Sequence, residues 1–135
     1  MYRFSTNFLA MEPLEGGPTR RSRLKTFADW TEGLFLPNPG FYLVYLYENR
    51  RMLHPIRDAV RVGASLEMDL FVPDSDLAPH HFTCEMGRDG LILQSRDAET
   101  QLNGTPVRSA RMAPGDVIYA GTTSFLLIEQ PERVH

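Results

Sequence analysis

The fold is decided by residues 69–82, which read Asp-Leu-Phe-Val-Pro-Asp-Ser-Asp-Leu-Ala-Pro-His-His-Phe. The stretch opens on a short apolar run, and a second, alternating run continues from Phe82 to Met86. Short apolar or alternating runs bounded by turn residues are typical of β-strands. Between the two runs, proline, aspartate and serine favour turns because they fix φ or hydrogen-bond to the local backbone. The stretch therefore predicts two strands joined by a turn-rich loop.

Similar runs recur on both sides of this stretch. Turn residues interrupt them about every 8–12 residues, the spacing expected of a β-sandwich. A hairpin is predicted at Gly87-Arg-Asp-Gly90, where two runs are joined by a two-residue turn. The strands are expected at Phe41–Tyr47 (a central strand), Leu53–Ile56 (paired with it), Ala59–Val62, Asp69–Val72, His81–Met86, Leu91–Gln94, Val117–Tyr119 and Ser124–Glu129.

The segment before Phe41 has a different pattern. Residues 1–19 are loosely patterned and read as an irregular arm that ends in Gly-Gly-Pro-Thr. In residues 20–32, Leu24, Phe27 and Trp30 recur at helical spacing, and Gly33 could end such a helix. The chain therefore divides into an N-terminal arm with an amphipathic helix (1–40), a sandwich (41–129) and a tail (130–135).

Composition limits the function classes. A chain of 135 residues suits one domain with a core, and a net charge of -3 argues against a nucleic-acid binder. The single cysteine, Cys84, excludes an internal disulfide and fits a reducing compartment. Neither a membrane-spanning run nor a signal peptide is recognisable, so a cytoplasmic location is expected. The chain could still be the soluble end of a longer membrane protein.

Five landmarks in order resemble the forkhead-associated (FHA) domain. They are Gly63 with Asp69 six residues later, the strand after Asp69, His81-Phe82, the turn Leu102-Asn103-Gly104, and residues 112–121 with Gly115-Asp116 and Gly121. The resemblance covers about Phe41–Glu129. It implies an all-β fold, an FHA-type antiparallel sandwich, here preceded by the N-terminal helical extension. In this family the histidine matching His81 braces a loop from inside, and the same structural role is expected here.

The same resemblance shows which binding residues are missing. The family opens with Gly-Arg and has a serine three residues before its histidine, whereas this chain has Ala64 and Ala78 at those positions. The family's peptide-gripping asparagine falls on Ala98, between Asp97 and Glu99. Phosphate recognition needs cationic and hydroxyl donors, and nearby carboxylates repel phosphate. Arg61, Arg96 or Arg88 could substitute, but none stands at the motif position.

One subgroup of FHA-like domains resembles residues 74–81 more closely. The run Asp-Ser-Asp-Leu-Ala-Pro-His-His is similar to a segment of the inner-membrane ring proteins of type III secretion systems. Their cytoplasmic FHA-like domains also lack the phosphate-binding set. This resemblance implies a docking and assembly domain in a larger bacterial complex. The segment before Phe41 is not part of that pattern.

Catalytic and metal sites are not expected. His80 and His81 are neighbours on a predicted strand, so their side chains should point to opposite faces and cannot share one ion. The serines lack partner histidine–acid pairs, and no phosphate-cradling glycine loop is present. The sequence therefore predicts no enzyme activity, no metal and no cofactor. Cys84 is interpreted as a buried structural thiol.

The sequence therefore predicts a non-catalytic protein–protein interaction module that does not read phosphate in the family's usual way and binds a protein partner independently of phosphate. By analogy with the family, the contact surface is formed by the loops 64–68, 75–80 and 95–100. Two alternatives stay open: a phosphopeptide reader with substitute cations, and a membrane-surface or self-assembly element driven by the N-terminal helix. The oligomeric state is open, since the arm could swap onto a neighbour. The candidate partner-binding residues are Ala64, Ser65, Ala78, His80, Arg96 and Asn103.

Overall fold

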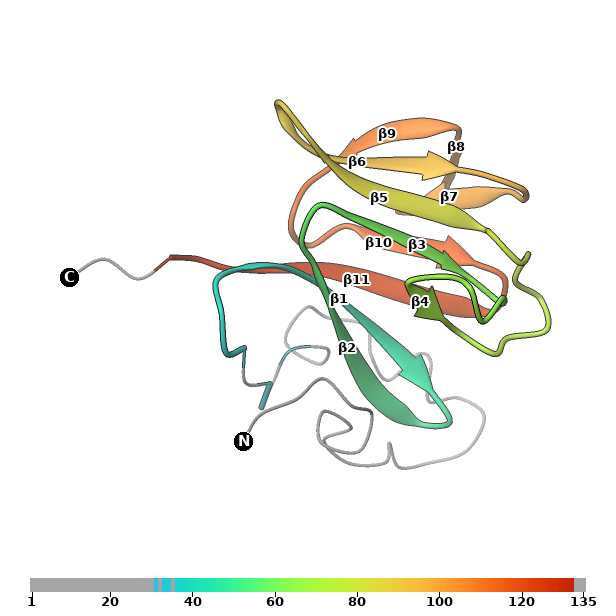
Figure 1. The fold of residues 1–135 in the computed structure, drawn as a ribbon, viewed down its shortest axis with the longest axis horizontal. Helices are drawn as coiled ribbons and strands as arrows, with labels where there is room; N and C mark the ends of the chain where they lie inside the picture. The colour runs from blue at the N-terminus through green and yellow to red at the C-terminus, as the bar shows by residue number, and fades with distance from the viewer. Residues whose placement is uncertain (1–30, 32, 35, 133–135) are drawn as a thin grey trace.

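The strands of the chain form two β-sheets packed face to face (Figure 1). The computed structural model describes residues 31, 33, 34 and 36–132. Most of the predicted helix at 20–32 lies outside the described residues. The sandwich itself runs from Gly40 to Gln130, which confirms the predicted all-β fold class.

The first sheet, here called sheet A, has six strands in the order β2-β1-β11-β10-β7-β8. Its pairings are antiparallel, and β1 lies centrally between β2 and β11, as the sequence predicts. Gly40 at the start of β1 is the register partner of Gln130 at the end of β11. The strands are β1 (Gly40–Tyr47), β2 (Arg50–Ile56), β7 (Thr100–Leu102), β8 (Thr105–Val107), β10 (Val117–Ala120) and β11 (Thr123–Gln130).

The second sheet, sheet B, has five strands in the order β4-β3-β5-β6-β9. The pair β3–β4 is parallel and the other pairs are antiparallel. The predicted hairpin is confirmed, because Gly87 pairs with Gly90 across a two-residue turn between β5 and β6. The strands are β3 (Ala59–Gly63), β4 (Leu70–Phe71), β5 (Phe82–Gly87), β6 (Gly90–Ser95) and β9 (Ser109–Met112).

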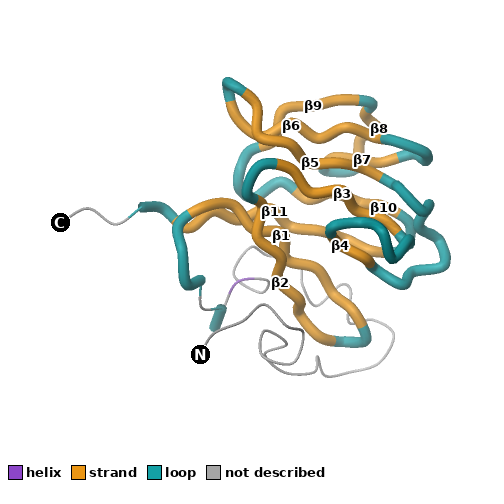
Figure 2. Tube along the Cα trace, in the orientation of Figure 1, coloured by secondary structure: helices purple, strands orange, loops and turns teal. Residues whose placement is uncertain are grey.

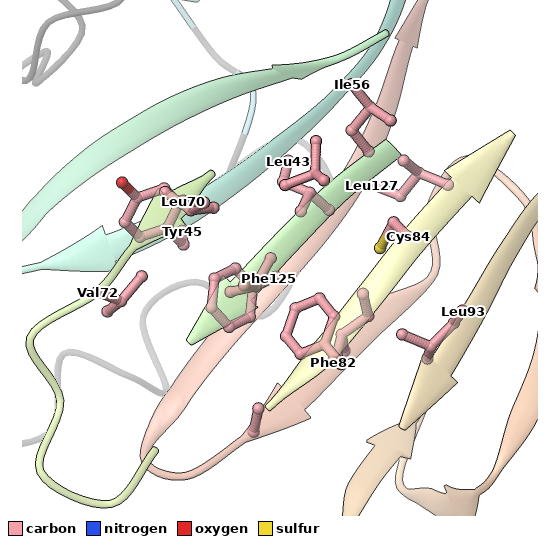
Figure 3. Packing of buried hydrophobic residues seen from close by; sticks show 14 of the residues in the cluster. Leu43, Tyr45, Ile56, Leu70, Val72, Phe82, Cys84, Leu93, Phe125 and Leu127 are labelled. Carbon is pink, nitrogen blue, oxygen red and sulfur yellow. The ribbon is translucent and has the colours of Figure 1, made fainter. Parts of the chain in front are cut away.

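The main core lies between the sheets and follows the alternation of the strands (Figure 3). Phe82 packs edge-on against Phe125, with ring centroids 5.2 Å apart, and thereby joins sheet B to sheet A. Cys84 is fully buried in this core, and burial raises the pKa of its thiol to about 12. The thiol is therefore protonated and structural, as the sequence predicts.

A second apolar cluster lies outside the main core and involves only strands of sheet A and the segment before it. Its buried members are Tyr42, Val44, Leu53, Leu126 and Ile128. Leu34 and Leu36, from the segment that leads into β1, pack against it. Sheet A is therefore apolar on both faces around β1 and β11.

Candidate functional site

Three loops meet at one end of the sandwich, on the right in Figure 2. They connect β3 to β4, β4 to β5, and β6 to β7, and they contain the segments 64–68, 75–80 and 95–100 that the sequence predicts as a contact surface. Backbone hydrogen bonds hold them in register with the strands. Val72 N–H donates to Gly63 O at 3.0 Å, and Arg96 N–H donates to His81 O at 2.9 Å. The predicted contact loops therefore form one continuous end of the molecule.

His81 joins two of these loops from inside. Its side chain is buried, Nδ1 accepts a hydrogen bond from Ala78 N–H at 3.0 Å, and Nε2 lies 2.8 Å from Glu99 O. A carbonyl can only accept, so Nε2 carries the proton and the imidazole is neutral. Both ring nitrogens are satisfied within the frame, which agrees with the structural role expected from the sequence.

Gly63 and Ala64 bring the β3–β4 loop into direct contact with the β4–β5 loop. Ala64 N–H donates to Ala78 O at 3.0 Å. A Cβ atom on Gly63 would lie 2.1 Å from Pro79 O, so only glycine allows this approach. Ala64 and Ala78 are thus held together through their backbones, and each contributes only a methyl group to the loop end.

Asp74 fixes the β4–β5 loop to the turn between β10 and β11. Its Oδ2 accepts hydrogen bonds from Thr122 N–H at 3.0 Å, Thr122 Oγ1 at 2.8 Å and Thr123 Oγ1 at 2.7 Å. Burial acts to raise the pKa of Asp74, but the hydrogen bonds together outweigh it and the net shift is downward. The carboxylate stays ionised and serves as an anchor for the loop.

Arg61, the first substitute cation, is already engaged by an acid. Its Nε lies 3.1 Å from Asp69 Oδ2, its backbone N–H donates to the same oxygen at 2.8 Å, and one terminal nitrogen donates to Glu67 O at 3.2 Å. Hydrogen bonds from the Arg61 side chain and backbone lower the pKa of Asp69 despite some burial. The guanidinium therefore holds the β3–β4 loop.

The His80 side chain contacts β5. Its Nε2 lies 2.8 Å from Thr83 Oγ1. Burial and then the charge of Arg96 lower the pKa of His80, while Asp97 acts in the opposite direction. The two histidines have separate partners, although both stand just before β5 rather than on it as the sequence predicts. Among the residues that the structure describes, no cluster of three histidine, cysteine or acidic side chains could hold a metal ion.

Arg96 lies beside a groove between the β6–β7 and β8–β9 connections. The groove has a volume of about 880 Å³, and its lining residues include Arg96, Asp97, Glu99 and Arg108. The Arg96 side chain is exposed. Arg88 lies in the β5–β6 hairpin, at the opposite end of β5 from His81, so the structure does not bring it to the loops.

The remaining two candidate residues have local partners. Ser65 Oγ accepts a hydrogen bond from Glu67 N–H at 3.1 Å and shapes the β3–β4 loop. Asn103 lies in the β7–β8 turn with φ of 54°, bonded to Asp116 and to Val117 N–H. The structure thus gathers five of the six candidates around the loops and places Asn103 in a structural turn.

Leu66 is a feature of the loop end that sequence reasoning missed. Its side chain is 82% exposed at the tip of the β3–β4 loop, the most exposed large apolar side chain of the described residues. An isolated leucine between polar neighbours carries no sequence signal of exposure, because leucine is usually buried. No helix in the described part of the chain has the length and apolar character that crossing a membrane requires.

Comparison with known proteins places the fold. No family model matches the sequence, and no curated protein matches it. Solved structures do match: the FHA domain of the CT664 protein from Chlamydia trachomatis has a TM-score of 0.62 at 19% identity, over 69% of this chain and 99% of that one.

Two further structures agree. The FHA domain of a hypothetical protein from Arabidopsis thaliana gives a TM-score of 0.61 at 21% identity, over 73% of this chain and 92% of that one. An FHA domain studied for phosphothreonine-dependent interactions gives 0.61 at 19% identity, over 67% of this chain and 99% of that one. The chain therefore has the fold of forkhead-associated domains.

Proposed function

We propose that this chain is a non-catalytic protein-interaction module whose loop end binds a polypeptide partner without requiring phosphothreonine. The partner contacts the β3–β4, β4–β5 and β6–β7 loops, with Ala64, Ser65, Ala78, His80 and Arg96 on or beside the contact surface. The module works in the cytoplasm as a docking domain of a larger bacterial assembly such as a secretion system.

The observation that carries the proposal is the pairing of Ala64 with Ala78. Their backbones are hydrogen-bonded at 3.0 Å, so the two positions lie together at the loop end. In the family they are the positions of an arginine and a serine. Two methyl groups supply neither charge nor hydroxyl, and a phosphate placed there would lose charge-assisted hydrogen bonds worth about 1.5–3 kcal/mol each.

The charges around this point also favour an unphosphorylated partner. Arg61 is neutralised by Asp69, with Nε 3.1 Å from the carboxylate. Asp97 and Glu99 add negative charge to the β6–β7 loop. The exposed side chain of Leu66 provides an apolar contact that needs no phosphate. Each of these features supports binding through shape and apolar contact.

The proposed place in a secretion apparatus rests on the sequence of residues 74–81. In the structure, these residues form an ordered loop that Asp74 fixes to the β10–β11 turn and His81 fixes to Glu99. An ordered loop is suited to a permanent assembly contact because little conformational entropy is lost on binding.

A phosphopeptide reader with a rebuilt cation site is the second candidate. Arg96 favours it, since this exposed guanidinium lies beside a groove of about 880 Å³. One of the matching solved structures is an FHA domain studied for phosphothreonine-dependent interactions, although that property belongs to that protein.

Calorimetric titration with a phosphothreonine peptide library and its unphosphorylated twin separates the two candidates. The proposal predicts no gain from phosphorylation at moderate salt. Micromolar binding of phosphorylated peptides, with none for their twins, would show that the inference from Ala64 and Ala78 is wrong. In that case Arg96→Gln should abolish the binding, whereas Arg88→Gln, at the far end of β5, should leave it unchanged.

The converse variant restores the missing anchors. Ala64→Arg together with Ala78→Ser should create phosphate-dependent binding, with a gain of at least about tenfold over the unphosphorylated twin, because about 1.4 kcal/mol is tenfold. Asp97→Asn in the same background should increase the gain further, since it removes a repelling charge. If phosphorylation brings the double variant no gain, then these two side chains do not explain the loss of phosphate recognition.

A further inference from the structure

The outer face of sheet A carries an apolar patch, formed by Tyr42 and Val44 of β1, Leu53 of β2, and Leu126 and Ile128 of β11. All five side chains are at most 3% exposed. Outward positions of a sandwich normally alternate to polar residues because they face water. This patch therefore belongs to a surface that is covered in the folded protein.

The segment before β1 begins that cover. Leu34 and Leu36 pack against the patch, and Tyr42 Oη donates to Asn38 O at 2.6 Å, which holds the connecting turn to β1. Leu36 and the residues after it run into β1 at the end of the sandwich away from β4 (Figure 1). The chain thus approaches sheet A across its outer face, away from the candidate loops.

The geometry at Gly33 indicates what precedes this segment. Gly33 has φ of 82°, and Leu34 N–H donates to Thr31 O at 3.1 Å. A glycine with positive φ and a bond back to the last turn is a common helix ending. Trp30 precedes Leu34 by four residues, so the connecting chain can span at most about 13 Å.

Residues 24–30, which precede this segment, include apolar side chains that could pack on the apolar patch. Leu24, Phe27 and Trp30 recur at helical spacing, whereas Lys25 and Asp29 fall on the opposite side of such a helix. The segment is additional to the shared fold, since two thirds of this chain already match 99% of an FHA domain. An apolar stripe tethered beside an apolar patch favours intramolecular docking, because the tether raises the effective concentration.

We propose that the outer face of sheet A is a docking surface for the chain's own residues 24–30, with Leu24, Phe27 and Trp30 packed over Tyr42, Leu53 and Leu126. The charged side chains within this segment, Lys25 and Asp29, remain on the solvent side. This segment gives the sandwich a third layer, and the loop end on the other side of the molecule stays free to bind its partner.

Trp30 is the single tryptophan of the chain, so its fluorescence tests the proposal directly. In the full-length protein, the emission should be blue-shifted relative to the urea-unfolded chain, and acrylamide should quench it several-fold less. A native emission and quenching constant equal to those of the unfolded chain would overturn the proposal.

Two variants locate the contact. Phe27→Ser alters the segment alone, and Leu53→Gln alters the patch on an edge strand. Each should raise the quenching constant of Trp30 several-fold while far-UV circular dichroism keeps the β-sheet signal. Phe71→Ser, on β4 of sheet B, is the matched control and should leave the quenching unchanged. Protection of Trp30 that survives both Phe27→Ser and Leu53→Gln would overturn the proposed contact.

The fluorescence of Trp30 also distinguishes docking within one chain from docking onto a second copy or onto a membrane. If a second copy supplied the segment, protection of Trp30 would be lost on dilution, with a dimer at high concentration in ultracentrifugation. If the segment bound a membrane, Trp30 would be exposed in buffer and protected only by vesicles containing an anionic lipid. Either result would contradict docking within one chain.

Discussion

At the residue scale, His81 decides whether the loop end keeps its shape. It connects Ala78 N–H with Glu99 O, and both ring nitrogens are used. The family resemblance predicts its bracing role, and the structure confirms it. The Arg61–Asp69 pair could not be predicted, because the two residues are eight apart and only the strand pairing brings them together.

Replacing His81 by alanine should therefore destabilise the protein by about 3–5 kcal/mol. The variant leaves the part-buried Ala78 N–H and Glu99 carbonyl without their His81 partner, at roughly 1–3 kcal/mol each, and adds a cavity in place of the buried imidazole. Urea unfolding monitored by circular dichroism measures the change. The control, His80→Ala, removes one contact with Thr83 at a less buried position and should cost about 1 kcal/mol. Equal costs for the two variants would contradict the role assigned to His81.

At the element scale, eight predicted strands are confirmed and three were not foreseen. Residues 100–102, 105–107 and 109–112 form β7, β8 and β9, yet each is short and carries few apolar residues. Pro106 lies in β8, an edge strand, where a missing N–H is tolerated. The sequence Asn103-Gly104 indicates a turn between β7 and β8, but it does not show that β7 pairs with β10 and so joins sheet A. Period alone cannot detect strands that depend on such long-range pairing.

Two glycines in different elements allow a matched test of the loop frame. Gly63→Ala at the end of β3 would bring Cβ within 2.1 Å of Pro79 O and force the β4–β5 loop to move, although its φ is compatible with alanine. Gly104→Ala has open space but keeps φ near 92°.

We expect Gly63→Ala to cost about 3 kcal/mol or more, because backbone must shift, and Gly104→Ala about 1 kcal/mol. Thermal unfolding gives the ranking. Only Gly63→Ala should also alter the amide NMR signals of Ala64 and Ala78. The reverse ranking would show that the positive φ of Gly104 costs more than the close approach of the loops at Gly63.

At the scale of the whole molecule, two histidines make stability depend on pH. Burial lowers the pKa of His54, with Asp69 acting against it, and burial followed by Arg96 lowers the pKa of His80. In the unfolded chain both titrate near the ordinary value of 6.5. As pH falls through that value, the unfolded state binds more protons than the folded state, so stability decreases.

The free energy of unfolding should accordingly fall between about pH 7 and pH 5. His54→Gln and His80→Gln should each flatten this slope. A further loss is expected below about pH 4, where Asp69 and Asp74, with pKa values lowered in the fold, become protonated. Chemical denaturation at a series of pH values measures the profile. A slope that is unchanged in both histidine variants would assign the pH dependence to other groups.

The pairing of Gly40 with Gln130 has a consequence for how the domain can be carried by other proteins. Antiparallel partners lie about 4.5–5.5 Å apart, so the sandwich starts and finishes at nearly one point. The far end of β11, about 25 Å away at the usual rise per residue, is bonded to Asp74 of the β4–β5 loop. The sandwich could therefore be carried as a side branch of a larger protein, with both of its chain connections at one end and the predicted contact loops at the other.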